Sequence, residues 1–152
     1  NLICILAAVL VGCLIGAING TGEGVVFIDG SIPHPTLGPI REPIRVEFRG
    51  SKIVDISGGQ EAEALKQLLA DANDPEHAYF MGEIGLGMNP ACSLNGRMLE
   101  DEGCAGTIHF GIGDDRSFGG NNICAQHIDL IFKAPTIRVD GRLIMQDGKV
   151  VD

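Results

Sequence analysis

The sequence predicts an α+β fold made mostly of short antiparallel strands and hairpins, with one clear helix. Glycine accounts for 22 of the 152 residues, about twice its usual share, which is typical of a chain with many turns. Short apolar segments rich in β-branched residues alternate with glycine-containing turns along most of the chain, as in antiparallel sheets. One segment, 57–72, instead has the apolar spacing of an amphipathic helix.

The length and charge limit the class of protein. A chain of 152 residues and 16.0 kDa corresponds to one domain, and we predict that residues 1–152 form a single domain. The net charge is −9, with 20 acidic against 11 basic side chains, which argues against a nucleic-acid partner because phosphate binding needs a basic surface. The five cysteines include no CxxC pair, so we expect reduced thiols and a cytoplasmic location.

The first 19 residues have two interpretations. Residues 2–18 carry no charge, and their length reaches the lower limit for crossing a bilayer. The same segment is rich in Ile, Val and Leu and is interrupted by Gly12 and Gly16, which also suits buried strands. We favour buried strands and keep a membrane span as the alternative. Because the chain begins with Asn1 inside this run, we expect a piece of a longer protein. We also expect a homo-oligomer, because an apolar run left exposed to water would pair with another copy of the chain.

The first predicted strands follow this segment. Gly24–Asp29 is apolar and β-branched and ends at an Asp-Gly turn pair. Residues 33–43 contain four prolines and predict a loop. Ile44–Phe48 and Ile53–Ile56 flank Arg49-Gly50-Ser51, a pattern typical of a hairpin.

The helix comes next. Ser57 and Gln60 fit a capping box, and Asn73 and Pro75 predict its end. The apolar positions that share one helical face are Ala62, Leu65, Leu68, Leu69 and Ala72.

The second half of the chain returns to strands. Asp140-Gly141 and Asp147-Gly148 are strong hairpin turn pairs, and they predict a C-terminal meander of four strands that begins with His127–Phe132. The predicted strands are Tyr79–Ile84, Thr107–Ile112, His127–Phe132, Thr136–Val139, Leu143–Met145 and Lys149–Val151.

Polar side chains inside these strands are the candidate site. His127 and Asp129 are two residues apart, so both project from the same face of an apolar strand. Burying them costs several kcal/mol unless they are paired or bind a metal. His109 lies in a similar strand, and Glu83 lies in the apolar segment MGEIG. Imidazole and carboxylate groups are ligands for Zn, Co, Mn and Fe, so we predict a divalent metal ion bound by Glu83, His109, His127 and Asp129. The alternative is that each histidine is a satisfied core residue and that Asp129 caps a turn.

Two further segments have weaker signals. The acidic run Glu100–Glu102 predicts a solvated surface or the N-terminus of a helix, with Glu102 as a candidate proton shuttle if it lies near the metal. The glycine-rich segment 111–122 does not fit GxGxxG, because Arg116 stands at the last required position. A nucleotide site is therefore not expected.

Five motifs, taken in order, resemble the metal-carrying C-terminal part of the aminopeptidase T family. They are GEIGLGMNP, LEDEGCAGTIHFGIGDD, FGGNN, QHIDLIF and DGRLIMQDG, and the resemblance covers residues 20–152. It implies the C-terminal fold of that family and a metalloprotease activity in which a metal-activated water, on zinc or another divalent ion, removes N-terminal amino acids from peptides. It also implies that Glu83, His109, His127 and Asp129 are the metal ligands.

The chain departs from this family at two places. The Pro-x-Gly-Glu element that carries a further metal ligand is absent from the N-terminal run, and Arg116 stands where the family has an active-site tyrosine. The same fold family includes a ring-cleaving non-haem iron dioxygenase acting on dihydroxypyridine, for which His109, His127 and Asp129 would suffice. We therefore predict a metal-dependent aminopeptidase-like hydrolase acting on a small peptide or other small molecule, with Arg116 holding a substrate carboxylate or oxyanion. The dioxygenase and a non-catalytic metal-binding domain are the alternatives.

Overall fold

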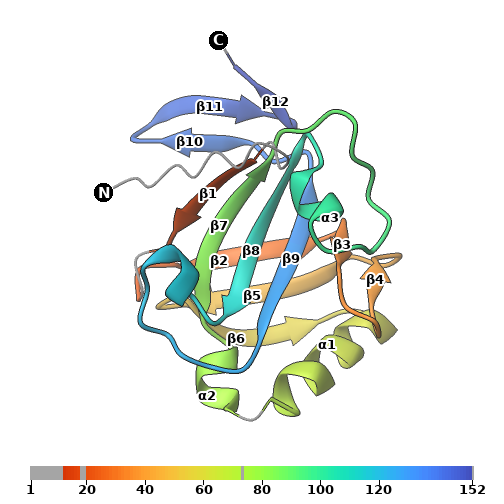
Figure 1. The fold of residues 1–152 in the computed structure, drawn as a ribbon, viewed down its shortest axis with the longest axis vertical. Helices are drawn as coiled ribbons and strands as arrows, with labels where there is room; N and C mark the ends of the chain where they lie inside the picture. Colours follow the sequence, from red (N-terminus) through yellow and green to blue (C-terminus); the bar gives the residue numbers. More distant parts are fainter. Residues whose placement is uncertain (1–11, 18–19, 73, 152) are drawn as a thin grey trace.

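A computed structural model describes residues 12–17, 20–72 and 74–151 of the chain (Figure 1). The strand pairings within its sheets are antiparallel. Among the described residues, only α1 (Gln60–Ala70) is a helix longer than four residues. The predicted α+β fold with mostly antiparallel strands is confirmed.

The largest sheet has six strands, and its centre is formed by segments that are distant in the sequence. The order is β1-β7-β8-β9-β3-β4. Their bounds are β1 (Gly12–Gly16), β7 (Met81–Gly87), β8 (Thr107–Gly113), β9 (His127–Lys133), β3 (Ser31–Ile32) and β4 (Gly38–Pro39).

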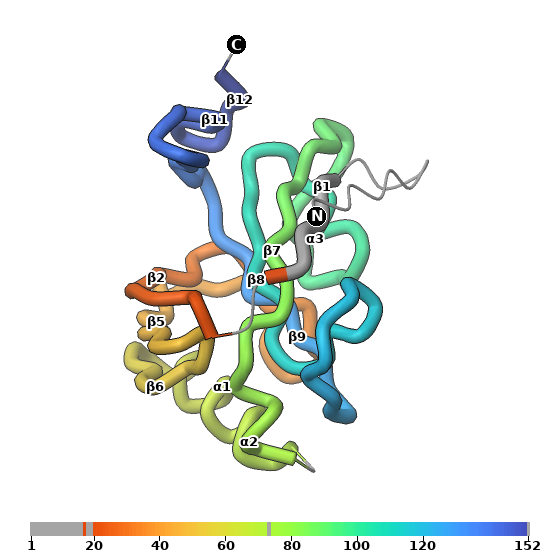
Figure 2. The backbone as a smooth tube through the Cα atoms, turned by 90° about the vertical axis from the view of Figure 1, so that its left-hand side faces the viewer, coloured from red at the N-terminus to blue at the C-terminus, as the bar shows by residue number. Residues whose placement is uncertain are grey.

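A second sheet covers one face of the first. It consists of β2 (Gly24–Ile28), β5 (Ile44–Arg49) and β6 (Lys52–Ser57) in the order β2-β5-β6. Figure 2 shows this sheet on one side of β7, β8 and β9. The core lies between the two layers. There the ring centroid of Phe110 lies 5.8 Å from that of Phe48 and 4.8 Å from that of Phe132, and both pairs pack edge to face.

The predicted hairpin between β5 and β6 is present, and its turn residues Gly50 and Ser51 have φ of +57° and +63°. The helix that follows also matches the prediction on its buried face, where Ala62, Leu65 and Leu69 are at most 1% exposed. The predicted cap is wrong, because Ser57 still belongs to β6 and the N-cap residue is Gly59, which makes no side-chain capping bond.

Three short helical turns complete the body of the molecule. They are α2 (Pro75–Ala78), α3 (Glu100–Gly103) and the 3-10 turn η1 (Arg116–Phe118). Tyr79 caps the end of α2, so the strand predicted from Tyr79 begins two residues later, at Met81. The α3 turn packs on β7, β8 and β9, on the side opposite the second sheet (Figure 2).

The C-terminal strands differ from the predicted meander. β10 (Ile137–Val139), β11 (Arg142–Gln146) and β12 (Lys149–Val150) form a separate sheet at one end of the molecule, whereas β9 belongs to the six-stranded sheet (Figure 1). Both predicted turn pairs have positive φ at Asp and Gly, +50° and +79° in the first and +48° and +75° in the second, as hairpin turns of this kind require.

The N-terminal prediction falls partly on described residues. β1 pairs with β7 along its whole length, so this part of the run is a strand in a sheet. Residues 1–11 and 18–19 lie outside the described part. None of the helices in that part combines the length and apolar character needed to cross a bilayer.

Candidate metal centre

The register of the central strands places the predicted ligands on one face of the sheet. Glu83 on β7 lies opposite Gly111 on β8, and Gly111 lies opposite Asp129 on β9. His109 and His127 are each two residues from this row, so their side chains project from the same face. This face is opposite to the one that packs on the second sheet.

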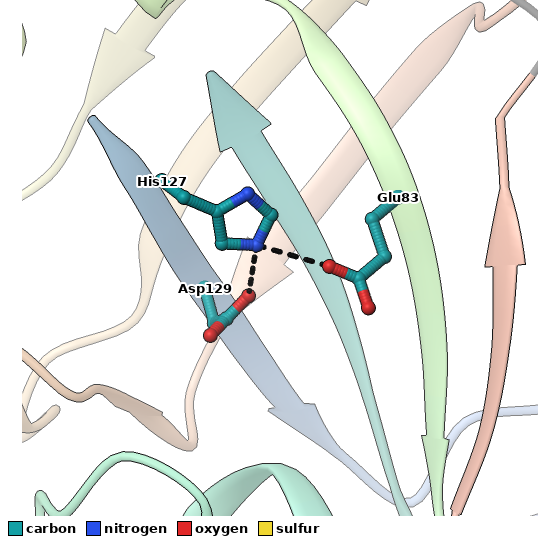
Figure 3. Close-up of side chains that lie close together, drawn as sticks. All are labelled: Glu83, His127 and Asp129. Atoms are coloured by element: carbon teal, nitrogen blue, oxygen red, sulfur yellow. Dashed lines mark ion pairs between the residues drawn. The ribbon is translucent and has the colours of Figure 1, made fainter. Parts of the chain in front are cut away.

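Three of these side chains converge closely (Figure 3). The Nε2 atom of His127 lies 3.0 Å from Oε2 of Glu83 and 3.2 Å from Oδ1 of Asp129. One donor atom from each residue lies within 4.8 Å of the others. Glu83 and Asp129 are 2% exposed, whereas the side chain of His127 is 28% exposed, so the group is reached from the side of His127.

The fourth predicted ligand, His109, lies at the edge of this group. It is 1% exposed, and its Nε2 atom lies 3.6 Å from Oε1 of Glu83. Both ring nitrogens of His109 and Oδ1 of Asp129 are buried without a hydrogen-bond partner. Because an unsatisfied buried polar atom costs about 1–3 kcal/mol, a cation that bound Nε2 of His109 and Oδ1 of Asp129 would satisfy two of these atoms.

Gly111 lies between the strands that carry Glu83 and Asp129, at a position for which the sequence predicted no role. A Cβ atom at this position would lie 2.6 Å from Cε1 of His127 and 2.7 Å from Oε2 of Glu83. Any larger residue would therefore displace two of the candidate ligands. The signal in the sequence is a glycine inside an apolar strand, which often marks a close approach of other groups.

A backbone carbonyl orients His127. Its Nδ1 atom lies 2.7 Å from the carbonyl oxygen of Asp114, so Nδ1–H donates there and Nε2 points toward the carboxylates. A histidine ligand is commonly fixed in this way by its second nitrogen. The sequence gives no sign of this contact, because any residue supplies a carbonyl.

The electrostatics of the group couple His127 and Glu83. Burial lowers the pKa of His127, but the carboxylates of Asp129 and Glu83 outweigh burial and raise this pKa to about 11. Burial raises the pKa of Glu83, but His109 and His127 outweigh it, so the pKa stays below its ordinary value. Without a cation, the proton on Nε2 of His127 balances part of the carboxylate charge.

The acidic run 100–102 forms the first turn of α3, as predicted for a helix N-terminus, and it is not a solvated surface. Asp101 is fully buried, and Glu102 is half-buried on α3, where its Oε1 accepts a hydrogen bond from the Leu99 N–H at 3.1 Å. Burial and the nearby charge of Asp129 raise the pKa of Glu102. Glu102 is therefore a further carboxyl group beside the candidate ligands.

Arg116 lies outside the group. Its Nε atom pairs with Oδ2 of Asp114 at 2.7 Å, and its side chain is 60% exposed. Of the two remaining histidines, His77 pairs with Asp74 on α2 and His34 bonds Thr36 in the proline-rich loop.

Comparison with known proteins decides the family. The NicX family model, described as 2,5-dihydroxypyridine 5,6-dioxygenase, matches residues 10–152. A protein of that description from Pseudomonas putida KT2440 is 30% identical over 141 residues, which covers 86% of this chain and 40% of the relative. The chain belongs to this family. It spans about two fifths of the length of that relative.

Solved structures agree with the fold. The structure of 2,5-dihydroxypyridine dioxygenase from Pseudomonas putida KT2440 matches with a TM-score of 0.81 and 26% identity, over 92% of this chain and 43% of that one. AmpT from Thermus thermophilus matches with a TM-score of 0.68 and 24% identity, over 93% of this chain and 39% of that one. The second match concerns the fold alone.

These matches correct part of what the sequence predicted. The predicted fold relationship to aminopeptidase T is confirmed, but the assignment as a hydrolase, aminopeptidase and metalloprotease is wrong, because the family is the dioxygenase family. The error arose because proteins of both kinds have this fold. The expectation of a divalent metal cofactor, with iron among the candidates, agrees with the cluster of Glu83, His127 and Asp129.

Proposed function

We propose that this chain is the metal-carrying part of a non-haem iron dioxygenase that opens the ring of a dihydroxylated pyridine or a closely related aromatic compound. The observation that carries the proposal is the buried group of Glu83, His127 and Asp129 in a chain of the 2,5-dihydroxypyridine 5,6-dioxygenase family. Histidine and carboxylate ligands with positions left open are typical of non-haem iron oxygenases.

The proposed ligands are the four residues named from the sequence. His127, Asp129 and Glu83 would hold the ion. His109, whose Nε2 lies 3.6 Å from Oε1 of Glu83 and makes no hydrogen bond, would be the fourth ligand. A ferrous ion bound there would supply the redox chemistry for reaction with dioxygen.

The protein would contribute in three ways. The carboxylates of Glu83 and Asp129 balance the charge of the ion. The burial of these groups and of His109 excludes bulk water and so strengthens their electrostatic interactions. The partly exposed edge at His127 leaves the side from which a small aromatic substrate would enter.

Oxygen uptake tests the proposal. The protein is loaded with Fe(II) without oxygen, mixed with 2,5-dihydroxypyridine and oxygen, and followed by oxygen consumption and by loss of the ring absorbance. We expect one dioxygen consumed per ring opened. The His127→Ala variant should lose this activity, and His77→Ala, which removes a histidine on α2 outside the group, should keep it. An iron-loaded wild type that consumes no oxygen with any dihydroxylated ring would overturn the proposal.

A cytoplasmic location is part of the same proposal. Cys92, Cys104 and Cys124 are free thiols, as a reducing compartment would keep them. Fractionation of cells that express the protein tests the location.

A further inference from the structure

Asp114, in the loop between β8 and β9, contacts His127 directly through its backbone. Its carbonyl oxygen accepts the hydrogen bond from Nδ1 of His127 at 2.7 Å. Its carboxylate is only 17% exposed and pairs with the Nε atom of Arg116 at 2.7 Å. The same carboxylate accepts the backbone N–H groups of Arg116 and Cys124, at 3.2 and 3.4 Å. The side chain of Asp114 thus helps to hold the peptide whose carbonyl group contacts the histidine, together with the backbone bonds from the Asp114 N–H to the Gln126 carbonyl at 2.8 Å and from the Asp115 N–H to the Asn122 carbonyl at 3.2 Å.

This contact decides which nitrogen of His127 is available. When Nδ1–H is bonded to a carbonyl, Nε2 is the nitrogen that can bind a metal, and the plane of the ring is set at the same time. Nε2 is the atom that lies between Glu83 and Asp129. A displaced Asp114 peptide would release Nδ1 and allow the ring to turn away from the carboxylates.

Two other contacts hold the same loop in place. The ring of Phe118, on the η1 turn that begins at Arg116, lies 5.8 Å from the ring of His127. Asp115 is fully buried, and its Oδ1 accepts the Asn122 N–H at 2.7 Å. The loop is therefore ordered on both sides of the Asp114 peptide.

We propose that the ion pair of Asp114 and Arg116 is a clamp that positions His127 for metal binding, with Asp114 as the positioning residue. The inference rests on the proposed function, because it takes Nε2 of His127 to be a metal ligand. Under this proposal, the exposed Arg116 affects metal affinity only by holding Asp114, and it does not contact the metal.

Metal affinity measured without turnover tests the clamp. Titration calorimetry with Mn(II) or Co(II) is carried out on the wild type, Asp114→Ala, Asp114→Asn, Arg116→Gln and the double variant Asp114→Ala/Arg116→Gln. Asp55→Ala is the matched control, because Asp55 also pairs with an arginine, Arg45, at 2.8 Å but on the opposite layer. The melting temperature of each metal-free variant is recorded alongside.

We expect Asp114→Ala to weaken metal binding about 10- to 100-fold, the usual effect of removing a group that orients a ligand. Arg116→Gln should have a smaller effect, and the double variant should be no weaker than Asp114→Ala, because both changes open the same clamp. Asp55→Ala should bind metal like the wild type. In zinc-loaded protein, the 15N shifts of the His127 ring should show Nδ1 protonated in the wild type and a mixture in Asp114→Ala.

The outcomes separate the clamp from the proposed function. If Asp114→Ala and Arg116→Gln bind metal like the wild type while His127→Ala does not, the clamp is wrong and the metal site stands. If His127→Ala also binds metal normally, the site itself is wrong. If Asp114→Ala does not fold, Asp114→Asn and Arg116→Gln carry the test, and an affinity loss that only follows a lower melting temperature overturns the clamp.

Discussion

At the scale of single residues, the site depends on one position with no side chain. Gly111 lies between β7 and β9, directly beneath His127 and Glu83. Only glycine leaves the space in which the two side chains approach each other. The polar residues of the site could be found in the sequence because buried charges are unusual in apolar strands, whereas Gly111 is one of 22 glycines and has no comparable signal.

The substitution Gly111→Ala tests whether the candidate site needs a glycine at this position. The added methyl group would meet Cε1 of His127 and Oε2 of Glu83 at less than 3 Å, so we expect metal affinity to fall by about tenfold or more, equivalent to roughly 1.4 kcal/mol. Calorimetric titration with Mn(II) measures it. Gly141→Ala is the control, because it is strained by a φ of +79° but has open space around it. Unchanged affinity in Gly111→Ala would show that the metal does not bind at this group.

The charge on His127 predicts how metal binding depends on pH. The pKa of about 11 means that Nε2 carries a proton at neutral pH in the metal-free protein. Metal must displace this proton, so affinity should rise with pH, by about tenfold per unit between about pH 7 and 9. Calorimetry in buffers of different ionisation enthalpy should show about one proton released per ion. A pH-independent affinity over this range would mean that His127 is not a ligand.

At the scale of elements, the structures that depend on residues close in the sequence were predicted correctly. The pairing of distant strands was not predicted. The β5–β6 hairpin, the buried face of α1 and the turns at Asp140 and Asp147 depend on neighbours in the chain, so the sequence predicted them. The order of strands in the large sheet joins β9 to β3, about 100 residues earlier in the chain, and no local pattern contains that pairing. The candidate metal ligands were also found from local patterns, as polar residues in apolar strands. The activity predicted for them was wrong, because one fold can carry different chemistries.

The α3 element depends on a buried carboxylate. Asp101 is fully buried, and its oxygens accept the backbone N–H groups of Asn95 and Gly96, both at 2.8 Å, and the hydroxyl of Ser31 on β3. Asp101→Ala would leave these donors unsatisfied, so we expect a loss of about 3 kcal/mol in the free energy of unfolding. Urea denaturation measures it. The neighbouring Glu100→Ala removes a carboxylate that bonds the exposed residues Ser93 and Asn95 and should cost less than about 1 kcal/mol. Equal costs for the two variants would contradict the anchoring role of Asp101.

At the scale of the whole molecule, the two faces of the large sheet have different tasks. One face packs on the second sheet and supplies the core, which includes Ile112, Ile128 and Leu130. The other face carries Glu83, His109 and Asp129, whose burial costs stability unless a cation binds them. A ligand that binds only the folded state stabilises it by about 2.7 kcal/mol at a concentration of 100 times its dissociation constant.

We therefore expect Fe(II) or Mn(II) at such a concentration to raise the melting temperature by roughly 5–10 °C, given that about 1 kcal/mol shifts a domain of this size by about 2–4 °C. The His127→Ala variant should show little of this rise, because it removes the candidate metal ligand whose Nε2 lies between Glu83 and Asp129. The exposed His77→Ala variant should show all of it. Differential scanning calorimetry under nitrogen, with EDTA-treated protein as the baseline, gives the shift directly. Added metal could instead leave the melting temperatures of both the wild type and His127→Ala unchanged. The polar face would then be a structural ion-pair network, and neither the metal centre nor the dioxygenase activity would belong to this part of the protein.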